Sequence, residues 1–306
     1  MTTWTRTPAE RARTWTVLGV PIDSVGAPDG GPLFGTELAP ETLRSVGIVD
    51  RLGAHDAGDV DARITGPSRD AVTGLVGGTT VAPVVDAVRR STRDLLADGA
   101  RPLVLGGCCT LLVGAFPAAA DVLGPIGLAY LDGHYDVYDH TTSPTGEVAD
   151  MPVALLLGRG EPGLLAASAP PSLTAERLRV LGARDTEEWA DVADLVTSLA
   201  LPAYDVDTIR SDPAGVGAAT AEALGGNGFW LSLDVDVLDE AAFPATDYLM
   251  PGGLSLDELH AVMSPLGRDE RCLGASIACY NPTKDPGLAH GRALTDLLVD
   301  VLGGAR

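Results

Sequence analysis

Cysteine is scarce in this sequence. Only four of the 306 residues are cysteines, which is too few for a disulfide scaffold in a chain of this length. Two of them, Cys108 and Cys109, are neighbours, and adjacent cysteines rarely form an unstrained bridge. We therefore expect free thiols in a reducing compartment, with contact to a metal or a substrate as the alternative role.

Basic residues are also few. The chain has 21 Lys and Arg against 42 Asp and Glu, which gives a formal net charge of −21. A surface this negative repels phosphate backbones and anionic lipids. Nucleic acid and membrane surfaces are therefore excluded as first expectations, and a small neutral or cationic molecule is the favoured partner.

Long apolar segments are missing as well. No run of about 18 apolar residues occurs, so we expect no transmembrane helix. The first residues, Met1 to Arg11, contain no apolar stretch of the kind found in secretory leaders. These absences make the cytoplasm the expected location.

What the sequence does contain is a regular alternation of strand and helix patterns. Short, nearly continuous apolar runs are typical of strands buried on both faces of a parallel sheet. Helical patterns over 39–44, 81–96 and 291–302 alternate with such runs. This alternation predicts a single α/β domain over 1–306, a three-layer α/β/α fold with a central parallel sheet. The strand candidates are Thr16–Val20, Pro102–Leu105, Ile126–Leu131, Arg177–Gly182, Phe229–Leu233 and Leu273–Ile277.

Two acidic motifs each follow one of these predicted strands. They are Asp132-Gly-His134-Tyr-Asp136 and Asp234-Val-Asp236, and ligands of α/β sheets bind beyond the carboxyl ends of strands. Crowded carboxylates repel one another, and a divalent cation is the simplest compensation. Five ligands exceed the needs of one cation, so we expect two, which can share a bridging hydroxide. Alone, either motif could instead be a helix cap or a solvated turn.

A third motif, Gly106-Gly107-Cys108-Cys109-Thr110, separates a predicted strand from an apolar helix. Paired glycines let the backbone approach a site closely. The alternative is a tight strand-to-helix turn with buried cysteines.

The order of these three motifs resembles the ureohydrolase superfamily, which contains arginase, agmatinase and formimidoylglutamase. The resemblance covers most of the chain. It implies a parallel sheet flanked by helices, a dinuclear manganese centre, and hydrolysis of a linear C–N bond by a metal-bridging hydroxide. It also implies a homo-oligomer, because trimers and hexamers are common in the family.

The resemblance assigns roles to individual residues. Asp132 and Asp234 would bridge both metals, and His134 and Asp236 would complete the shell of one of them. Asp136 would bind the other metal and handle the proton of the hydroxide. These roles agree with the general chemistry of such sites, in which metals lower the pKa of water and a carboxylate moves protons.

The sequence departs from the family at one expected metal ligand. Cys109 stands where the family has a ligating histidine, and a cysteine at this place resembles the hydroxyarginine-hydrolysing relative from cycloserine biosynthesis. A thiolate can bind a divalent metal and loses its proton on binding. Manganese is the first expectation, and zinc, iron or nickel are alternatives because thiolates favour softer metals.

The positions that contact substrate in the family differ too. Cys279 stands two residues before an Asn-Pro pair, where the family has the carboxylate that binds a guanidinium. In the loop after Asp136, Thr145 and Glu147 match the residues that bind the substrate carboxylate, and Ala149 replaces a proton-shuttling histidine. A glutamate would repel a carboxylate and attract a cationic amine. The expected substrate is an amidine or guanidine other than arginine.

Two further hypotheses remain open. The first is a catalytically silent homologue that binds metal, because the shuttle histidine and the guanidinium partner are absent. The second keeps the fold but uses Cys109 as a covalent nucleophile, as thiol amidinotransferases do, although no general base can be assigned to it from spacing. His140 could serve near the shuttle position, or it could be an exposed loop residue.

Overall fold

The computed structural model describes residues 14–24, 35–66, 68–169, 172–187 and 189–303. The segment 1–13, in which we expect no secretory leader, lies outside these ranges. Within them, every helix is too short or too polar to cross a membrane.

Eight strands form one sheet in the order β2-β1-β3-β8-β7-β4-β5-β6. Every neighbouring pair is parallel, which confirms the predicted parallel sheet. All six predicted strands are present, with ends that shift by one residue or so. The strands are β1 (Trp15–Val20), β2 (His55–Asp59), β3 (Arg101–Gly106), β4 (Gly127–Leu131), β5 (Leu178–Leu181), β6 (Ala203–Tyr204), β7 (Phe229–Asp234) and β8 (Cys272–Ala278).

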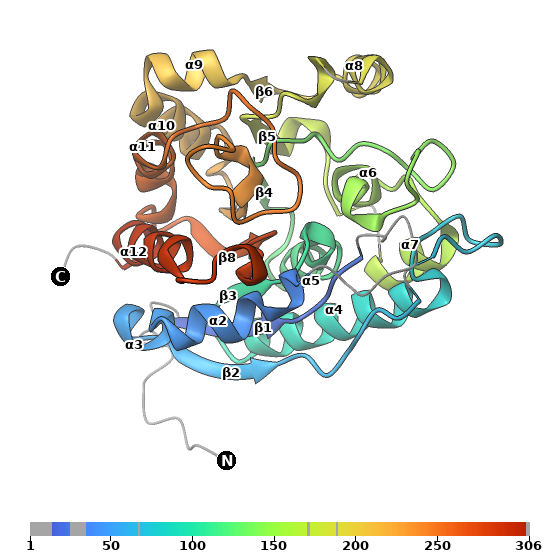
Figure 1. Cartoon of the computed structure of the whole chain (residues 1–306), viewed down its shortest axis with the longest axis horizontal. Coiled ribbons are helices and arrows are strands. Elements are labelled where there is room, and N and C mark those ends of the chain that lie inside the picture. Colours follow the sequence, from blue (N-terminus) through green and yellow to red (C-terminus); the bar gives the residue numbers. More distant parts are fainter. Residues whose placement is uncertain (1–13, 25–34, 67, 170–171, 188, 304–306) are drawn as a thin grey trace.

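Helices cover both faces of the sheet, so the three-layer α/β/α architecture is confirmed (Figure 1). One layer contains α2 (Ala39–Ser45), α3 (Ile48–Leu52), α9 (Val206–Ser211), α10 (Pro213–Leu224), α11 (Leu256–Gly267) and α12 (Ala289–Leu302). The other contains α4 (Val81–Ala97), α5 (Leu112–Leu123), α6 (Pro152–Leu156) and α7 (Pro162–Ser168). Helix α8 (Ala190–Leu199) packs on the short turn that follows β5.

The central strands are apolar because they are buried on both faces. Every residue of β1, β4 and β7 is buried. The two strands that the sequence did not predict are the edge strands. Strand β2 is polar and mostly exposed, and β6 has only two residues, so neither carries the apolar run of a buried strand.

The strand order brings the sequence motifs together. β3, β8, β7 and β4 are consecutive neighbours in the middle of the sheet. Because parallel strands all point the same way, the residues that follow these four strands meet at one edge. Cys109 follows β3, Cys279 follows β8, Asp234 ends β7 and Asp132 follows β4.

Candidate metal centre

The five predicted acid and imidazole ligands line a single cavity at this edge of the sheet. All four aspartates are buried, and His134 is the most exposed of the five, with 23% of its side chain accessible. They are Asp132, His134, Asp136, Asp234 and Asp236.

Three of these side chains form a compact group, which we call the acid–imidazole group. One ligand atom from each of Asp132, His134 and Asp236 lies within 4.8 Å of the other two. The His134 Nδ1 atom is 3.0 Å from Asp236 Oδ2 and 3.6 Å from Asp132 Oδ1. Backbone amides fix the carboxylates, because Gly133 N donates to Asp236 Oδ1 at 2.9 Å and His134 N donates to Asp132 Oδ1 at 2.7 Å.

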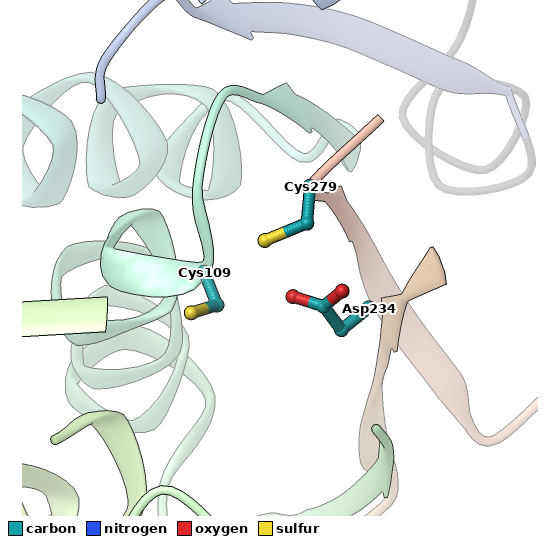
Figure 2. Close-up of side chains that lie close together, drawn as sticks. All are labelled: Cys109, Asp234 and Cys279. Carbon is teal, nitrogen blue, oxygen red and sulfur yellow. The ribbon is translucent and has the colours of Figure 1, made fainter. Parts of the chain in front are cut away.

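Cys109, Asp234 and Cys279 form a second group, which we call the dithiol group. Their ligand atoms also lie within 4.8 Å of one another, and all three residues are buried. Figure 2 shows Cys279, after the end of β8, and Asp234, at the end of β7, extending toward Cys109 in the turn after β3, whose sulfur is turned aside in this view. The sequence predicts Cys109 as a metal ligand, but it predicts Cys279 as a residue that contacts the substrate. All four cysteines are free, as expected.

Burial and mutual repulsion perturb the carboxyl groups. Burial first, and then the charge of Asp236, raises the pKa of Asp132 to about 7. The pKa values of Asp136 and Asp234 are raised well above the ordinary carboxyl value, again by burial first and then by neighbouring aspartates. Burial also acts to raise the pKa of Asp236, but His134 beside it holds that pKa below its usual range. A divalent cation would take the place of the protons that these groups otherwise keep.

The donor set fits a cation on two further observations. The buried Oδ2 atom of Asp132 has no hydrogen-bond partner among the described residues, and orphaned buried acceptors are rare. Among the described residues, no lysine or arginine forms an ion pair with any of the four buried aspartates. Arg184 lies close to Asp236 but donates to its backbone carbonyl oxygen, at 3.0 Å. The negative charge of these carboxylates is therefore not neutralised by an ion pair with Lys or Arg, and a metal ion could neutralise it.

Asp136 differs from the other four residues. It lines the cavity but belongs to neither compact group. Its backbone has φ of +51°, a left-handed conformation that is uncommon outside glycine and is found at functional sites. The buried Tyr130 hydroxyl donates to Asp136 Oδ2, which fixes the direction of the carboxylate.

The predicted close approach at the glycine pair is confirmed at Gly107. A Cβ atom there would lie 1.5 Å from the carbonyl oxygen of Ile22. Gly107 also accepts a backbone hydrogen bond from Cys279 N at 2.8 Å. Its backbone therefore sets the positions of both thiols of the dithiol group.

We expect Gly107→Ala to reduce metal content and turnover together, because the backbone between Ile22 and Cys279 has to move. Metal analysis and circular dichroism of the purified variant test this. Gly226→Ala is the matched control, since a Cβ at Gly226 meets no atom within 4 Å. Full metal content in Gly107→Ala would contradict the expectation.

The predicted substrate residues lie on the same cavity. Thr145 donates its hydroxyl hydrogen to Asp150 Oδ2 at 2.8 Å, and the buried Glu147 carboxylate accepts from the Tyr248 hydroxyl. Burial raises the pKa of Asp150 to about 6. This wall of the cavity is therefore acidic, and two of its acids are held by hydroxyl donors.

Sequence reasoning missed several residues of the cavity wall. Asp185 follows β5 directly after Gly182-Ala-Arg184, so its position after a predicted strand was a signal for it. The others lie outside the motifs used in the sequence analysis. They are Asp150, Trp189, Asp247 and Tyr248.

Histidines are scarce around the cavity. His134 is the one histidine among the described residues that line it. His140 does not line it and is half-buried, so the view of His140 as an exposed loop residue is wrong. Cys109 donates to the Ala149 carbonyl oxygen at 3.0 Å. The cavity histidine, His134, belongs to the acid–imidazole group and not to the group that contains Cys109.

The parallel sheet and the donor groups at its carboxyl edge define an α/β protein with a candidate dinuclear metal centre. Comparison with known proteins identifies the family. The model of the arginase family matches residues 13–303, and the chain belongs to this family. Its members are hydrolases of non-peptide C–N bonds in linear amidines, and this protein is such a hydrolase.

Individual relatives match over nearly their whole length. The chain is 28% identical to an arginase of Brevibacillus brevis, over 94% of this chain and 97% of the relative. The arginase structure from Bacillus caldovelox superposes with a TM-score of 0.85 at 25% identity, over 95% and 98% of the two chains. Proclavaminate amidinohydrolase from Streptomyces clavuligerus shares the fold, with a TM-score of 0.73 at 21% identity over 97% and 93%.

Proposed function

We propose that the protein is a dinuclear-metal hydrolase that cleaves a linear C–N bond in an amidine or guanidine other than arginine. The observation that carries the proposal is the convergence of four buried aspartates and one histidine on one cavity. A hydrolytic role needs such a set, because metals bound there would supply hydroxide near neutral pH by lowering the pKa of water.

The residues present suggest which of them hold the metals. The acid–imidazole group offers oxygen and nitrogen donors, which suit manganese as well as zinc, iron or nickel. The dithiol group offers sulfur and oxygen donors. Asp132 and Asp234 stand in different groups, one after β4 and one at the end of β7, which is consistent with bridging carboxylates between two cations.

Asp136 is the proposed catalytic residue. It would hold a proton on its carboxylate and pass it to the nitrogen that leaves, a task that commonly contributes 10²–10⁴-fold to the rate. The hydroxyl of Tyr130 fixes this carboxylate at the cavity wall. Ala149 offers no side chain for proton transfer, whereas Asp136 lines the cavity and lies outside both ligand groups.

The charge of the cavity points to a cationic or neutral substrate. Glu147, Asp150, Asp185 and Asp247 line the wall, and no lysine or arginine of the described chain lines it. Such a wall attracts an amine and repels a carboxylate. This argues against arginine and for a substrate whose far end carries a positive charge or none. A cytoplasmic homo-oligomer, trimer or hexamer, is the assembly that the family resemblance implies.

A substrate panel tests the proposal. The purified protein is loaded in turn with manganese, zinc, iron and nickel and offered guanidines, amidines and formimino compounds, with arginine included. We expect turnover of at least one compound without a carboxylate, and poor turnover of arginine. No turnover of any compound with any metal would favour the catalytically silent homologue.

We expect Glu147→Gln to raise KM for a cationic substrate about 10-fold or more, because a hydrogen bond to a charged group contributes about 1.5–3 kcal/mol. The value of kcat and the metal content should change little, since Glu147 belongs to neither ligand group. Steady-state kinetics with a cationic and a neutral substrate measures the effect.

The control for this prediction is Glu161→Gln. Glu161 caps α7 and does not line the cavity, so its loss of charge should leave KM unchanged. An unchanged KM in Glu147→Gln, or an equal rise for the neutral substrate, would contradict a role in binding the amine.

A further inference from the structure

We propose that Cys279 is a metal ligand, and that Cys109, Cys279 and Asp234 form a dithiolate–carboxylate site for a thiophilic divalent cation such as zinc. The inference rests on the proposed function only in that both place metal in this cavity. It gives the two ends of the centre different chemistry: sulfur-rich around Cys109, and oxygen and nitrogen around His134.

The geometry of the dithiol group carries the inference. The two sulfur atoms and a carboxylate oxygen lie within 4.8 Å of one another, and the Cys279 and Asp234 side chains extend toward Cys109 (Figure 2). Around tetrahedral zinc, with zinc–sulfur bonds of about 2.3 Å, two thiolates are about 3.8 Å apart. Rotation of the Cys109 thiol away from the Ala149 carbonyl oxygen, to which it donates here, would close the three donors around one ion.

The backbone holds Cys279 in this orientation. Its φ is +65°, in the left-handed region where a side chain other than that of glycine or asparagine is rare. Its N–H donates to the carbonyl oxygen of Gly107 at 2.8 Å, two residues before Cys109. Strained backbone of this kind persists where the surroundings fix it and is concentrated at functional sites.

Cys279 is also a poor substrate contact. A guanidinium requires a planar, bidentate acceptor such as a carboxylate, and one sulfur atom cannot provide it. Two neighbouring thiols and a buried carboxylate are instead a ligand set that zinc prefers. Asp234 is held for this role, because Asp236 N donates to its Oδ1 atom at 3.1 Å.

Charge supports the same assignment. When a divalent cation binds, the two thiols release their protons to water, as does the Asp234 carboxyl group where it carries one, and the thiols become thiolates. With the Asp234 carboxylate, three negative charges then surround two positive ones. The buried Asp132 Oδ2 atom, which has no partner among the described residues, lines the same cavity and is available to a neighbouring cation.

Cobalt substitution tests the proposal without relying on turnover. The full-length protein, freed of metal and titrated with Co²⁺, should show a thiolate-to-cobalt charge-transfer band in the near ultraviolet. Cys279→Ser should reduce this band by about half, because one of two thiolates is lost. It should also weaken zinc binding at one site by more than about 100-fold, since even outer partners of a ligand contribute 10–100-fold. Cys109→Ser should do the same.

Cys272→Ser is the matched control. Cys272 lies at the other end of β8, is equally buried, and directs its sulfur to the Gly274 carbonyl oxygen. The Cys272→Ser substitution removes one buried thiol from the same strand and should leave the cobalt band unchanged. Thermal unfolding of each variant shows whether it is folded. If a variant does not fold, the intensity of the wild-type band decides, because two thiolates should give about twice the intensity of one.

The outcomes are distinguishable from those of the substrate panel. The inference would be overturned if the wild-type cobalt protein lacked the band, or if Cys279→Ser left the band intact. It would also be overturned if Cys109 and Cys279 formed a disulfide in protein prepared with a reducing agent. In the first two cases the hydrolase could still turn over substrate with oxygen-bound metals. A band lost in Cys279→Ser, with no turnover of any compound, would support the site and contradict the proposed activity.

Discussion

Replacing Asp234 by asparagine is expected to lower turnover by about 10³-fold or more and to release at least one of two bound ions. Asp234 ends β7 and is buried, and it is the one carboxylate of the dithiol group. Metals contribute several kcal/mol to such reactions, and each 1.36 kcal/mol is about tenfold in rate. Metal analysis of the purified variant and kinetics with the best substrate of the panel give both numbers.

An exposed aspartate provides the control for this substitution. Asp207 lies on α9 with 94% of its side chain accessible, so Asp207→Asn removes the same charge far from the cavity. It should keep both ions and full turnover. Asp234→Asn with two ions and unchanged kcat would show that this carboxylate holds no metal.

Asp136→Asn should separate proton transfer from metal binding. The amide keeps the size of the side chain but cannot accept the proton, so kcat should fall by about 10²–10⁴-fold. Because Asp136 lies outside both compact groups, we expect a smaller loss of metal than in Asp234→Asn. Turnover is compared with ion content measured on the same sample.

Tyr130→Phe completes this comparison. It removes the hydroxyl that donates to Asp136 and leaves the carboxylate in place, so kcat should fall less than in Asp136→Asn. An Asp136→Asn variant that keeps its kcat would exclude the proposed proton transfer, whatever its metal content.

The main features of the fold could be predicted because they follow from burial. Strands such as β4 and β7, whose residues are all buried, show continuous apolar runs. The edge strands β2 and β6 could not be predicted, since β2 is polar and β6 has two residues. What identifies these two is pairing with a neighbour, and pairing leaves no local pattern in the sequence.

The site was predictable to the extent that its residues follow directly after strands. The motifs around Asp132 and Asp234 come together because their strands are parallel neighbours. The approach of Cys279 to Cys109 depends on the pairing of β8 with β3 and on the hydrogen bond from Cys279 to Gly107. Neither can be inferred from spacing along the chain.

Loop residues were the hardest to foresee. Tyr248 reaches Glu147 across 101 positions of sequence, and the conformation of its loop decides that contact. Asp150 comes near Thr145 in sequence, but its burial, and with it the rise of its pKa to about 6, depends on packing around the cavity. Such residues line the cavity, which is why the substrate is harder to predict than the family.

The central claim is that the buried acids, the imidazole and the thiols at the carboxyl edge of the sheet hold two cations. Anomalous diffraction from crystals of the metal-loaded protein tests it most directly. We predict two peaks about 3.5–4 Å apart, one beside His134 and Asp236 and the other between Cys109, Asp234 and Cys279. Protonated carboxyls around a cavity with no anomalous peak, in crystals grown with excess metal, would contradict it.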